Sequence, residues 1–237
     1  MSRALHGALL LAAIAADYSE NAHAGRPFTT DDASVLEAGS CQLEAWVDRS
    51  NVRTEGWVAP ACNFGLGIEW QLGGARAHVD GRNAYSQSYA QGKFAFVSVA
   101  DHSWGLGLVV GVQRFALREA ERGWSDPYVL VPLSFQVGTE GALLHLNAGW
   151  TRDKAEARDV TPWGVAFETP VTGTPVTLLG EAFGLNAHHP MYRLGGRWNA
   201  AAKNLDLDLS WVTRPGGVRS ERYVSIGLYY KFDSILH

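Results

Sequence analysis

Apolar and polar residues alternate one by one over much of this chain, and that alternation most constrains the fold. The clearest run is LDLDLSW at residues 205–211, and similar runs cover 66–72 and 144–151. A β-strand places successive side chains on opposite faces, whereas helical spacing fits none of these runs. The chain is therefore predicted to be all-β.

Turn-forming residues divide the chain into about twelve predicted strands. We expect these strands at residues 41–50, 55–63, 65–77, 87–100, 104–116, 127–137, 142–152, 161–169, 175–185, 190–199, 204–213 and 222–232. The connections after even-numbered strands are short, and most of the others are longer and more charged, as at 118–122, 152–159 and 214–221. Tight turns at one end and long loops at the other are typical of outer-membrane barrels, in which the short turns are periplasmic.

The alternation alone does not separate a membrane barrel from a soluble sandwich, because both bury one face of a sheet. Strands of about ten residues and aromatic residues near strand ends favour the barrel. Those aromatic residues are Trp57, Trp104, Trp124, Trp150, Trp163, Trp198 and Trp211. We therefore predict a closed, antiparallel, up-and-down transmembrane β-barrel in the outer membrane of a Gram-negative cell, because a lipid-exposed sheet must close on itself.

The first residues have the pattern of a secretory signal peptide. Arg3 precedes the apolar run 8–16, and an A-x-A site at 22–24 predicts cleavage before Gly25. The apolar run is too short to span a bilayer as a helix. We expect residues 1–24 to be a cleaved signal that exports the chain through the inner membrane, followed by an N-terminal segment at 25–40, the barrel at 41–232 and a tail at 233–237.

The chain contains two cysteines, Cys41 and Cys62. An even number in an exported protein favours a disulfide, and a metal site would need more ligands. Cys41 begins the first predicted strand and Cys62 ends the second, so both are expected at the periplasmic rim. A bridge there would join the first hairpin.

The last predicted strand resembles the terminal β-signal by which Gram-negative barrels are recognised for assembly. The residues that carry the resemblance are Ser225, Gly227, Tyr230 and Phe232. In that family Phe usually ends the chain, whereas here residues 233–237 follow it. The resemblance implies the barrel-assembly machinery as a partner.

The start of the mature chain resembles a family of outer-membrane proteins grouped as putative transporters of the MetA phenol-degradation pathway type. The resemblance is carried by GRPFTTDD at 25–32, VLEAG at 35–39 and CQLEAW at 41–46. It covers most of the mature chain as pattern more than as identity. It implies passage of small molecules and assigns no site residue.

Several charged residues fall on the predicted inner face of the barrel. The candidates for a lumen constriction or for internal ion pairs are Glu69, Glu181, Arg193, Arg197, Asp206, Asp208 and Lys231. Rings of charge select solutes in channels, whereas paired charges across strands fill a narrow lumen and fix the register. The hairpin around 200–203 is expected to bring Arg197 near Asp206. Both interpretations stay open, and segment 25–40 is expected either inside the barrel as a plug or in the periplasm.

The predicted function is passive passage of small solutes through a narrow polar lumen, as in a porin-like channel. A structural or adhesive barrel with an occluded lumen is the alternative, and a lipid-modifying barrel enzyme is the third hypothesis. The sequence contains no known catalytic motif, so we expect no enzyme, and nothing in it indicates a metal or cofactor. The net charge of −4 gives no reason to expect a nucleic-acid partner. The expected partners are outer-membrane lipids, the assembly machinery and small solutes.

Overall fold

The computed structural model describes residues 26–79, 82–99, 101–115, 126–154, 156–186, 189–200 and 204–233. The predicted signal peptide, Trp124 and most of the predicted tail lie outside this part of the chain. Across the described ranges, the only helical element is the 3₁₀ turn η1 (Arg219–Glu221), and no helix has the length and apolarity to cross a membrane.

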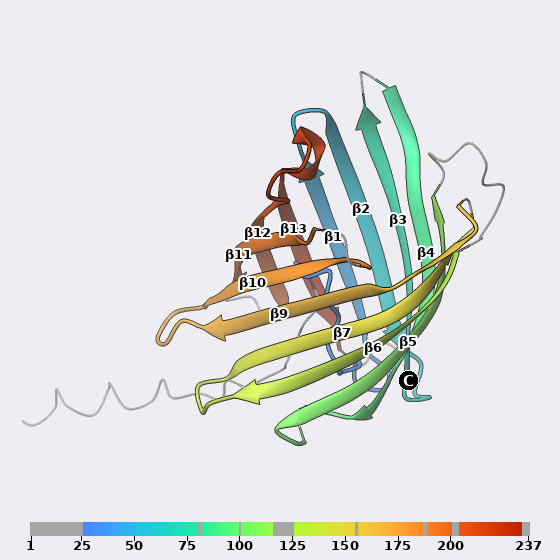
Figure 1. The fold of residues 1–237 in the computed structure, drawn as a ribbon. Helices are drawn as coiled ribbons and strands as arrows, with labels where there is room; N and C mark the ends of the chain where they lie inside the picture. The colour runs from blue at the N-terminus through green and yellow to red at the C-terminus, as the bar shows by residue number, and fades with distance from the viewer. Residues whose placement is uncertain are drawn as a thin grey trace, which may run out of the picture.

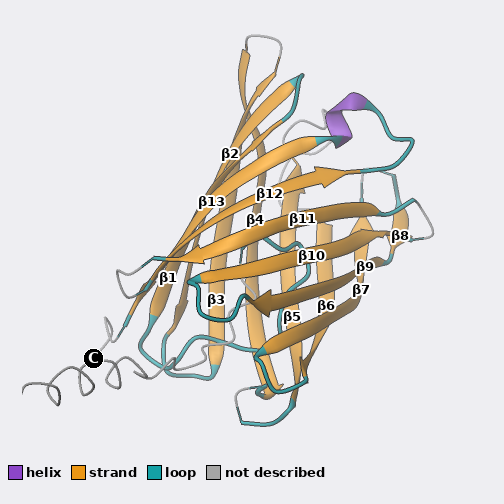
Figure 2. Cartoon of the chain, turned by 90° about the vertical axis from the view of Figure 1, so that its left-hand side faces the viewer, coloured by secondary structure: helices purple, strands orange, loops and turns teal. Residues whose placement is uncertain are grey.

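All strands belong to one antiparallel sheet. They are β1 (Cys41–Arg49), β2 (Arg53–Asn63), β3 (Ile68–Val79), β4 (Arg82–Val97), β5 (Trp104–Phe115), β6 (Asp126–Val137), β7 (Ala142–Asp153), β8 (Arg158–Val160), β9 (Pro162–Pro170), β10 (Val176–Leu185), β11 (Met191–Asn199), β12 (Leu205–Thr213) and β13 (Tyr223–Phe232). Strand β1 pairs with both β2 and β13, and β6 pairs with both β5 and β7. The sheet therefore closes into a barrel of twelve strands (Figures 1 and 2).

The predicted strands agree with the observed ones, and the differences lie at the ends. Strands β3 and β4 continue to Val79 and Arg82, where a long connection was expected, because their backbone pairing persists past a register shift at Ala75/Arg76. The predicted loop 152–159 is partly a hairpin, since β8 folds back on β7 with Asp153 opposite Arg158. We call the end where β1 begins and β13 finishes the turn end, and the opposite end the loop end.

Apolar side chains point outward and polar side chains point inward around the barrel. On β12, Leu207, Leu209 and Trp211 are 39, 57 and 50% exposed, while Asp208 and Ser210 are buried. A soluble sandwich would show the reverse, because its apolar face is the one that packs inside. The polar face encloses the interior, which we call the lumen.

The prediction for one of the aromatic residues, Trp57, was wrong. Trp57 was expected at a membrane interface, but it lines the lumen cavity, where it stacks on Trp46 of β1. By contrast, Trp104, Trp150 and Trp198 expose more than two fifths of their surface on the outside. The two-residue period of β2 gives the reason, because Trp57 shares its face with the buried Ala59 and Ala61.

Residues 26–40, which we call the lumen segment, precede β1 and lie within the barrel (blue in Figure 1). The segment is not a strand of the sheet. Arg26, Thr30, Asp32, Ala33 and Leu36 are all buried although the segment adds no layer to the wall. It therefore occupies part of the interior that the sheet encloses.

Candidate functional site: the lumen and its segment

Side chains of the wall hold the backbone of the lumen segment. Glu181 of β10 accepts hydrogen bonds from the amides of Thr29 and Thr30 at 2.8 and 2.5 Å. Further amides of the segment donate to Glu44, Asn147, Ser134 and Glu69 at 2.9–3.2 Å. Buried backbone groups need partners, and here wall side chains supply what a neighbouring strand would otherwise supply. This explains how an irregular segment is stable inside the barrel.

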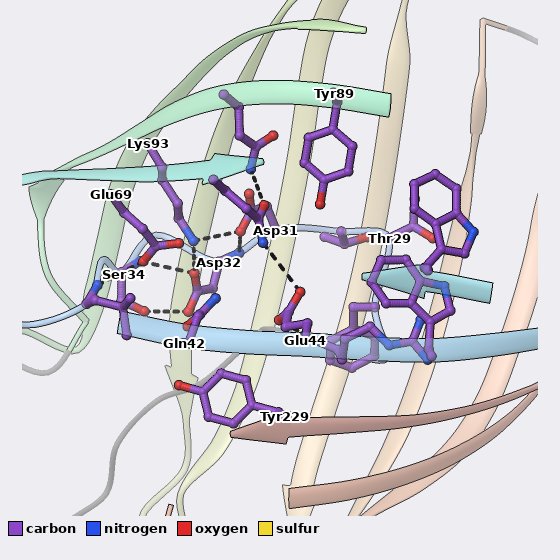
Figure 3. A pocket seen from close by; sticks show the side chains of 18 of the residues that line it. Thr29, Asp31, Asp32, Ser34, Gln42, Glu44, Glu69, Tyr89, Lys93 and Tyr229 are labelled. Carbon is purple, nitrogen blue, oxygen red and sulfur yellow. Dashed lines mark hydrogen bonds and ion pairs between the residues drawn. The ribbon is translucent and has the colours of Figure 1, made fainter. Parts of the chain in front are cut away.

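Lys93 of β4 fixes the middle of the lumen segment. Its Nζ donates to Asp31 Oδ1 at 2.6 Å and also to Asp32 Oδ1 (Figure 3). Burial favours the neutral acid, but the charge of Lys93 and hydrogen bonds from Lys93 and Ser34 outweigh it and lower the pKa of Asp32. Asp32 is therefore an anionic anchor that ties the segment to the wall.

Arg26 anchors the start of the lumen segment on the opposite part of the wall. Its Nη2 donates to Asp208 Oδ1 at 3.1 Å and to Ser225 Oγ at 2.7 Å. Its guanidinium carbon lies 4.4 Å from the ring centre of Trp46. The carbonyl oxygen of Arg26 also accepts a hydrogen bond from Arg197 at 2.9 Å.

The predicted inward charges are inside the barrel, but most bind the segment or other wall residues rather than one another. Arg193 and Glu181 form an ion pair at 3.3 Å, the one pair within the predicted set in the part of the chain that the structure describes. Glu69 binds the amide of Leu36, and Lys231 lies 3.1 Å from Asp233. These contacts agree better with the interpretation as ion pairs that fill the lumen than with an open ring of charge that selects solutes.

The predicted neighbour of Arg197 was wrong by one side-chain step. Arg197 lies opposite Asp208 in the register, and Asp206 lies opposite Asn199, which donates to it at 2.8 Å. The ion-pair partner of Arg197 is Glu168 of β9 at 3.1 Å. The connection between β11 and β12 is longer than the expected hairpin, which shifts the pairing by two residues.

Ser134, His145 and Glu168 form a hydrogen-bonded chain across β6, β7 and β9. Ser134 Oγ lies 2.8 Å from His145 Nδ1, and His145 Nε2 lies 3.4 Å from Glu168 Oε1. The side chains resemble those of a serine hydrolase. Ser134 Oγ, however, accepts the amide of Ala33, and Ser134 and His145 are fully buried beneath the segment. In this position the three hydrogen-bonded side chains support the lumen segment rather than facing a substrate.

A cavity of about 530 Å³ remains between the segment and a wall formed mainly by β1–β4 and β13, to which Leu130 of β6 and Arg193 of β11 also contribute. It is lined by Gln42 and Glu44 of β1 (Figure 3). Asp48, near the loop end of β1, also lines it, so the cavity extends along the strand. Its lining includes an aromatic row in which Trp46 and Trp57 stack at 5.1 Å and 4°, with Tyr89 6.4 Å from Trp57. The described part of the chain contains no group of three or more His, Cys, Asp or Glu side chains arranged to hold a metal ion.

Glycines on the inner face make room for the lumen segment. A Cβ at Gly105 would lie 3.0 Å from Ala33 Cβ, and one at Gly164 would lie 3.2 Å from Thr30 Cβ and overlap its Oγ1. A Cβ at Gly227 would lie 2.8 Å from Arg26 Nη2. Arg26, Asp31 and Asp32 were not among the site residues predicted from the sequence. Inward glycines at these strand positions are the signal that could have indicated a close-packed occupant.

The predicted disulfide between Cys41 and Cys62 is confirmed. It joins the start of β1 to the end of β2 at the turn end, with the two residues directly opposite in the register. Next to it, Asn63 donates through Nδ2 to Leu36 O at 2.6 Å and accepts the amide of Gly39 at 2.8 Å. The bridge therefore fixes the point at which the lumen segment enters the wall.

The four residues of the predicted assembly signal lie on both faces of β13. Ser225 and Gly227 face inward, where Ser225 contacts Arg26. Tyr230 and Phe232 face outward, and their rings meet edge to face at 4.6 Å. Two of these residues thus have a packing role in the lumen, and their part in assembly stays a prediction.

Among the solved structures similar in fold are two porins and one outer membrane channel. The KdgM porin matches with a TM-score of 0.57 and 9% identity over 81% of this chain and 99% of its own. The NanC porin matches with a TM-score of 0.55 and 9% identity over 81% and 100%. The COG4313 outer membrane channel from Pseudomonas putida F1 matches with a TM-score of 0.51 and 10% identity over 85% and 98%. At these identities the likeness shows the fold, an outer-membrane β-barrel.

No curated protein sequence matches this chain significantly. One family model does, and its match extends over residues 10–232, which includes the lumen segment and every strand. The chain therefore belongs to the family described as "Uncharacterised conserved protein UCP029691".

Proposed function

We propose that this protein is an outer-membrane channel for small solutes in which the lumen segment narrows the passage. The observation that supports the proposal is the cavity that extends along β1 beside the segment. Its volume of about 530 Å³ is in the range of sites that hold small organic molecules. The turn end is periplasmic in this proposal, and the signal peptide and the terminal β-signal bring the chain to the outer membrane. Passage of small molecules also agrees with the resemblance to transporters of the MetA phenol-degradation pathway type.

The charges around the cavity favour cations and neutral solutes over anions. The acidic lining residues are Asp31, Asp32, Glu37, Glu44, Asp48, Glu55 and Glu69, and the basic ones are Arg26, Lys93, Arg193 and Lys231. An excess of one sign in a confined polar passage raises the local concentration of the opposite sign. The KdgM porin was solved in complex with oligogalacturonate. We propose a different solute class for this chain, neutral or cationic.

The test is the current through purified protein in planar bilayers. A tenfold gradient of KCl should give discrete conductance steps and a reversal potential of the sign expected for K⁺ preference. Asp48→Asn together with Glu44→Gln should shift the reversal potential toward zero, because both carboxylates line the cavity. Conductance with Cl⁻ preference would contradict the charge argument, and a complete absence of conductance would contradict the channel.

A structural or adhesive barrel with an occluded lumen is the second candidate. The observation that favours it is the number of wall residues that bind the segment, among them Glu181, Lys93 and Arg197. In that case no current flows even though the barrel is folded. The bilayer measurement therefore separates the two functions. The third hypothesis, a lipid-modifying enzyme, is not favoured because Ser134 and His145 are fully buried beneath the segment.

A further inference from the structure

The guanidinium of Arg26 lies in a cradle on the lumen wall, formed by Trp46, Asp208, Ser225 and Gly227. Asp208 accepts from Nη2 at 3.1 Å, Ser225 accepts from the same atom at 2.7 Å, and the ring centre of Trp46 is 4.4 Å from the guanidinium carbon. A carboxylate at the edge of a planar cation and an aromatic ring over its face are the two contacts such cations favour. The cradle therefore has the chemistry of a site for a flat organic cation.

The wall builds this cradle through its strand register. Asp208 of β12 lies opposite Gly227 of β13, and Gly227 lies opposite Trp46 of β1. The three residues thus follow one another across adjacent strands. A Cβ at Gly227 would lie 2.5 Å from Asp208 Oδ2 and 2.8 Å from Arg26 Nη2, so glycine leaves the floor open for a planar group.

The cradle is continuous with the lumen cavity. Arg26 and Trp46 line that cavity, and the stacked ring of Trp57 continues the aromatic surface away from the cradle. Asp48 also lines it, and its buried Oδ1 has no hydrogen-bond partner among the described residues. A cationic solute in the cavity would therefore meet an acidic, aromatic surface that leads to the position of the Arg26 guanidinium.

The Arg26 side chain is held separately from its backbone. Glu44 accepts the amide of Arg26 at 3.2 Å, and Arg197 donates to its carbonyl oxygen at 2.9 Å. Neither contact involves the guanidinium. The side chain can therefore leave the cradle while the lumen segment stays in place.

We propose that this cradle binds the guanidinium, or a similarly flat cationic group, of an organic solute, and that Arg26 is its built-in competitor. The proposal rests on the proposed function, because it names the class of solute that the lumen takes. A competitor that occupies the site most of the time weakens the apparent affinity in proportion to the vacant fraction. Removal of the Arg26 side chain should therefore expose the site to solutes.

The test is calorimetric titration of detergent-purified protein with L-argininamide, and with L-citrulline as a neutral probe of similar shape. Arg26→Ala should bind L-argininamide at least about tenfold more tightly than the unsubstituted protein, as removal of a competitor present more than about nine tenths of the time requires. L-citrulline should gain nothing. Asp208→Asn added to Arg26→Ala should remove the gain, since the carboxylate at the edge of the cation is then neutral.

Two sets of controls keep the result specific. Arg26→Met refills the space over Trp46 but makes no hydrogen bond to Asp208 or Ser225, so it should gain less than Arg26→Ala. Arg152→Ala and Asp159→Asn alter an exposed ion pair of the same length, 3.1 Å, and should leave binding unchanged.

Equal affinity in Arg26→Ala and the unsubstituted protein would overturn the proposal. A gain that L-citrulline shares, or one that survives Asp208→Asn, would overturn it as well. The titration does not depend on conductance, so the two proposals can be contradicted independently. Absence of conductance contradicts the channel, and absence of a gain in affinity for L-argininamide contradicts the cradle.

Discussion

At the scale of single residues, the lumen is organised by charges that bind across chain segments far apart in the sequence. Lys93 of β4 contacts Asp31 and Asp32, although its register partner on β3 is Glu69. A buried charge that loses its partner is costly, because no water replaces the lost interaction. The contacts of Lys93 therefore decide whether the lumen segment stays bound to the wall.

Replacement of Lys93 by Met should release the lumen segment. The change leaves Asp31 and Asp32 without their shared cation, a loss of about 3–5 kcal/mol for a buried pair. We expect faster amide exchange at Thr29, Thr30 and Ala33, measured by hydrogen exchange and mass spectrometry. Arg152→Met, at an exposed ion pair, should change exchange little. Unchanged protection in Lys93→Met would show that the backbone contacts alone hold the segment.

At the scale of elements, the twelve long strands of the barrel could be predicted from the sequence, because alternation and turn residues report local backbone geometry, whereas the three-residue β8 lies where a loop was expected. The position of the lumen segment stayed open between the barrel interior and the periplasm, because most of the wall residues that hold it lie far along the chain. Thr30, for example, is held by Glu181, and Ala33 by Ser134. The pairing of Arg197 with Asp208 rather than Asp206 was missed for a similar reason, since register depends on turn length that alternation does not report.

Gly164 of β9 offers a test of how the segment packs on the wall. Gly164→Leu should displace the segment near Thr30, because even a Cβ there overlaps the Thr30 side chain. We expect a larger bilayer conductance than in the unsubstituted protein. Gly180→Leu is the matched control on the neighbouring strand, since the nearest atom to its Cβ is Leu194 Cδ2 at 3.7 Å. Equal conductance in both variants would argue against close packing at Gly164.

The Cys41–Cys62 bridge should stabilise the first hairpin and the entry of the lumen segment. It closes a loop with a sequence separation of 21 residues. Replacement of both cysteines by Ser should lower the free energy of unfolding by about 2–4 kcal/mol, because the unfolded chain gains freedom. The measurement is a urea unfolding curve in detergent micelles, with reductant added to the unsubstituted protein as a control. An unchanged midpoint in both samples would contradict a stabilising role.

At the scale of the whole molecule, different features of the sequence determine the wall of the barrel and the segment inside it. The two-residue period sets the two faces of the wall, with Leu209 outside and Asp208 inside, and the strand length and outward aromatic residues favour a membrane barrel over a sandwich. What occupies the lumen depends on which inward side chains contact the segment, and the alternation of apolar and polar residues does not predict those contacts. The function proposed for the molecule therefore depends on the segment more than on the strands.

Single-channel conductance with and without residues 27–38 tests the central claim most directly. This claim is that the lumen segment occupies and narrows a barrel that otherwise conducts. Deletion of these residues removes the anchors at Thr29, Thr30 and Asp32 and leaves Gly39, Ser40 and the disulfide in place. The account predicts a conductance several times that of the full-length protein, with folding confirmed by heat-modifiable migration in gels. A folded deletion variant whose conductance equals that of the full-length protein would contradict it.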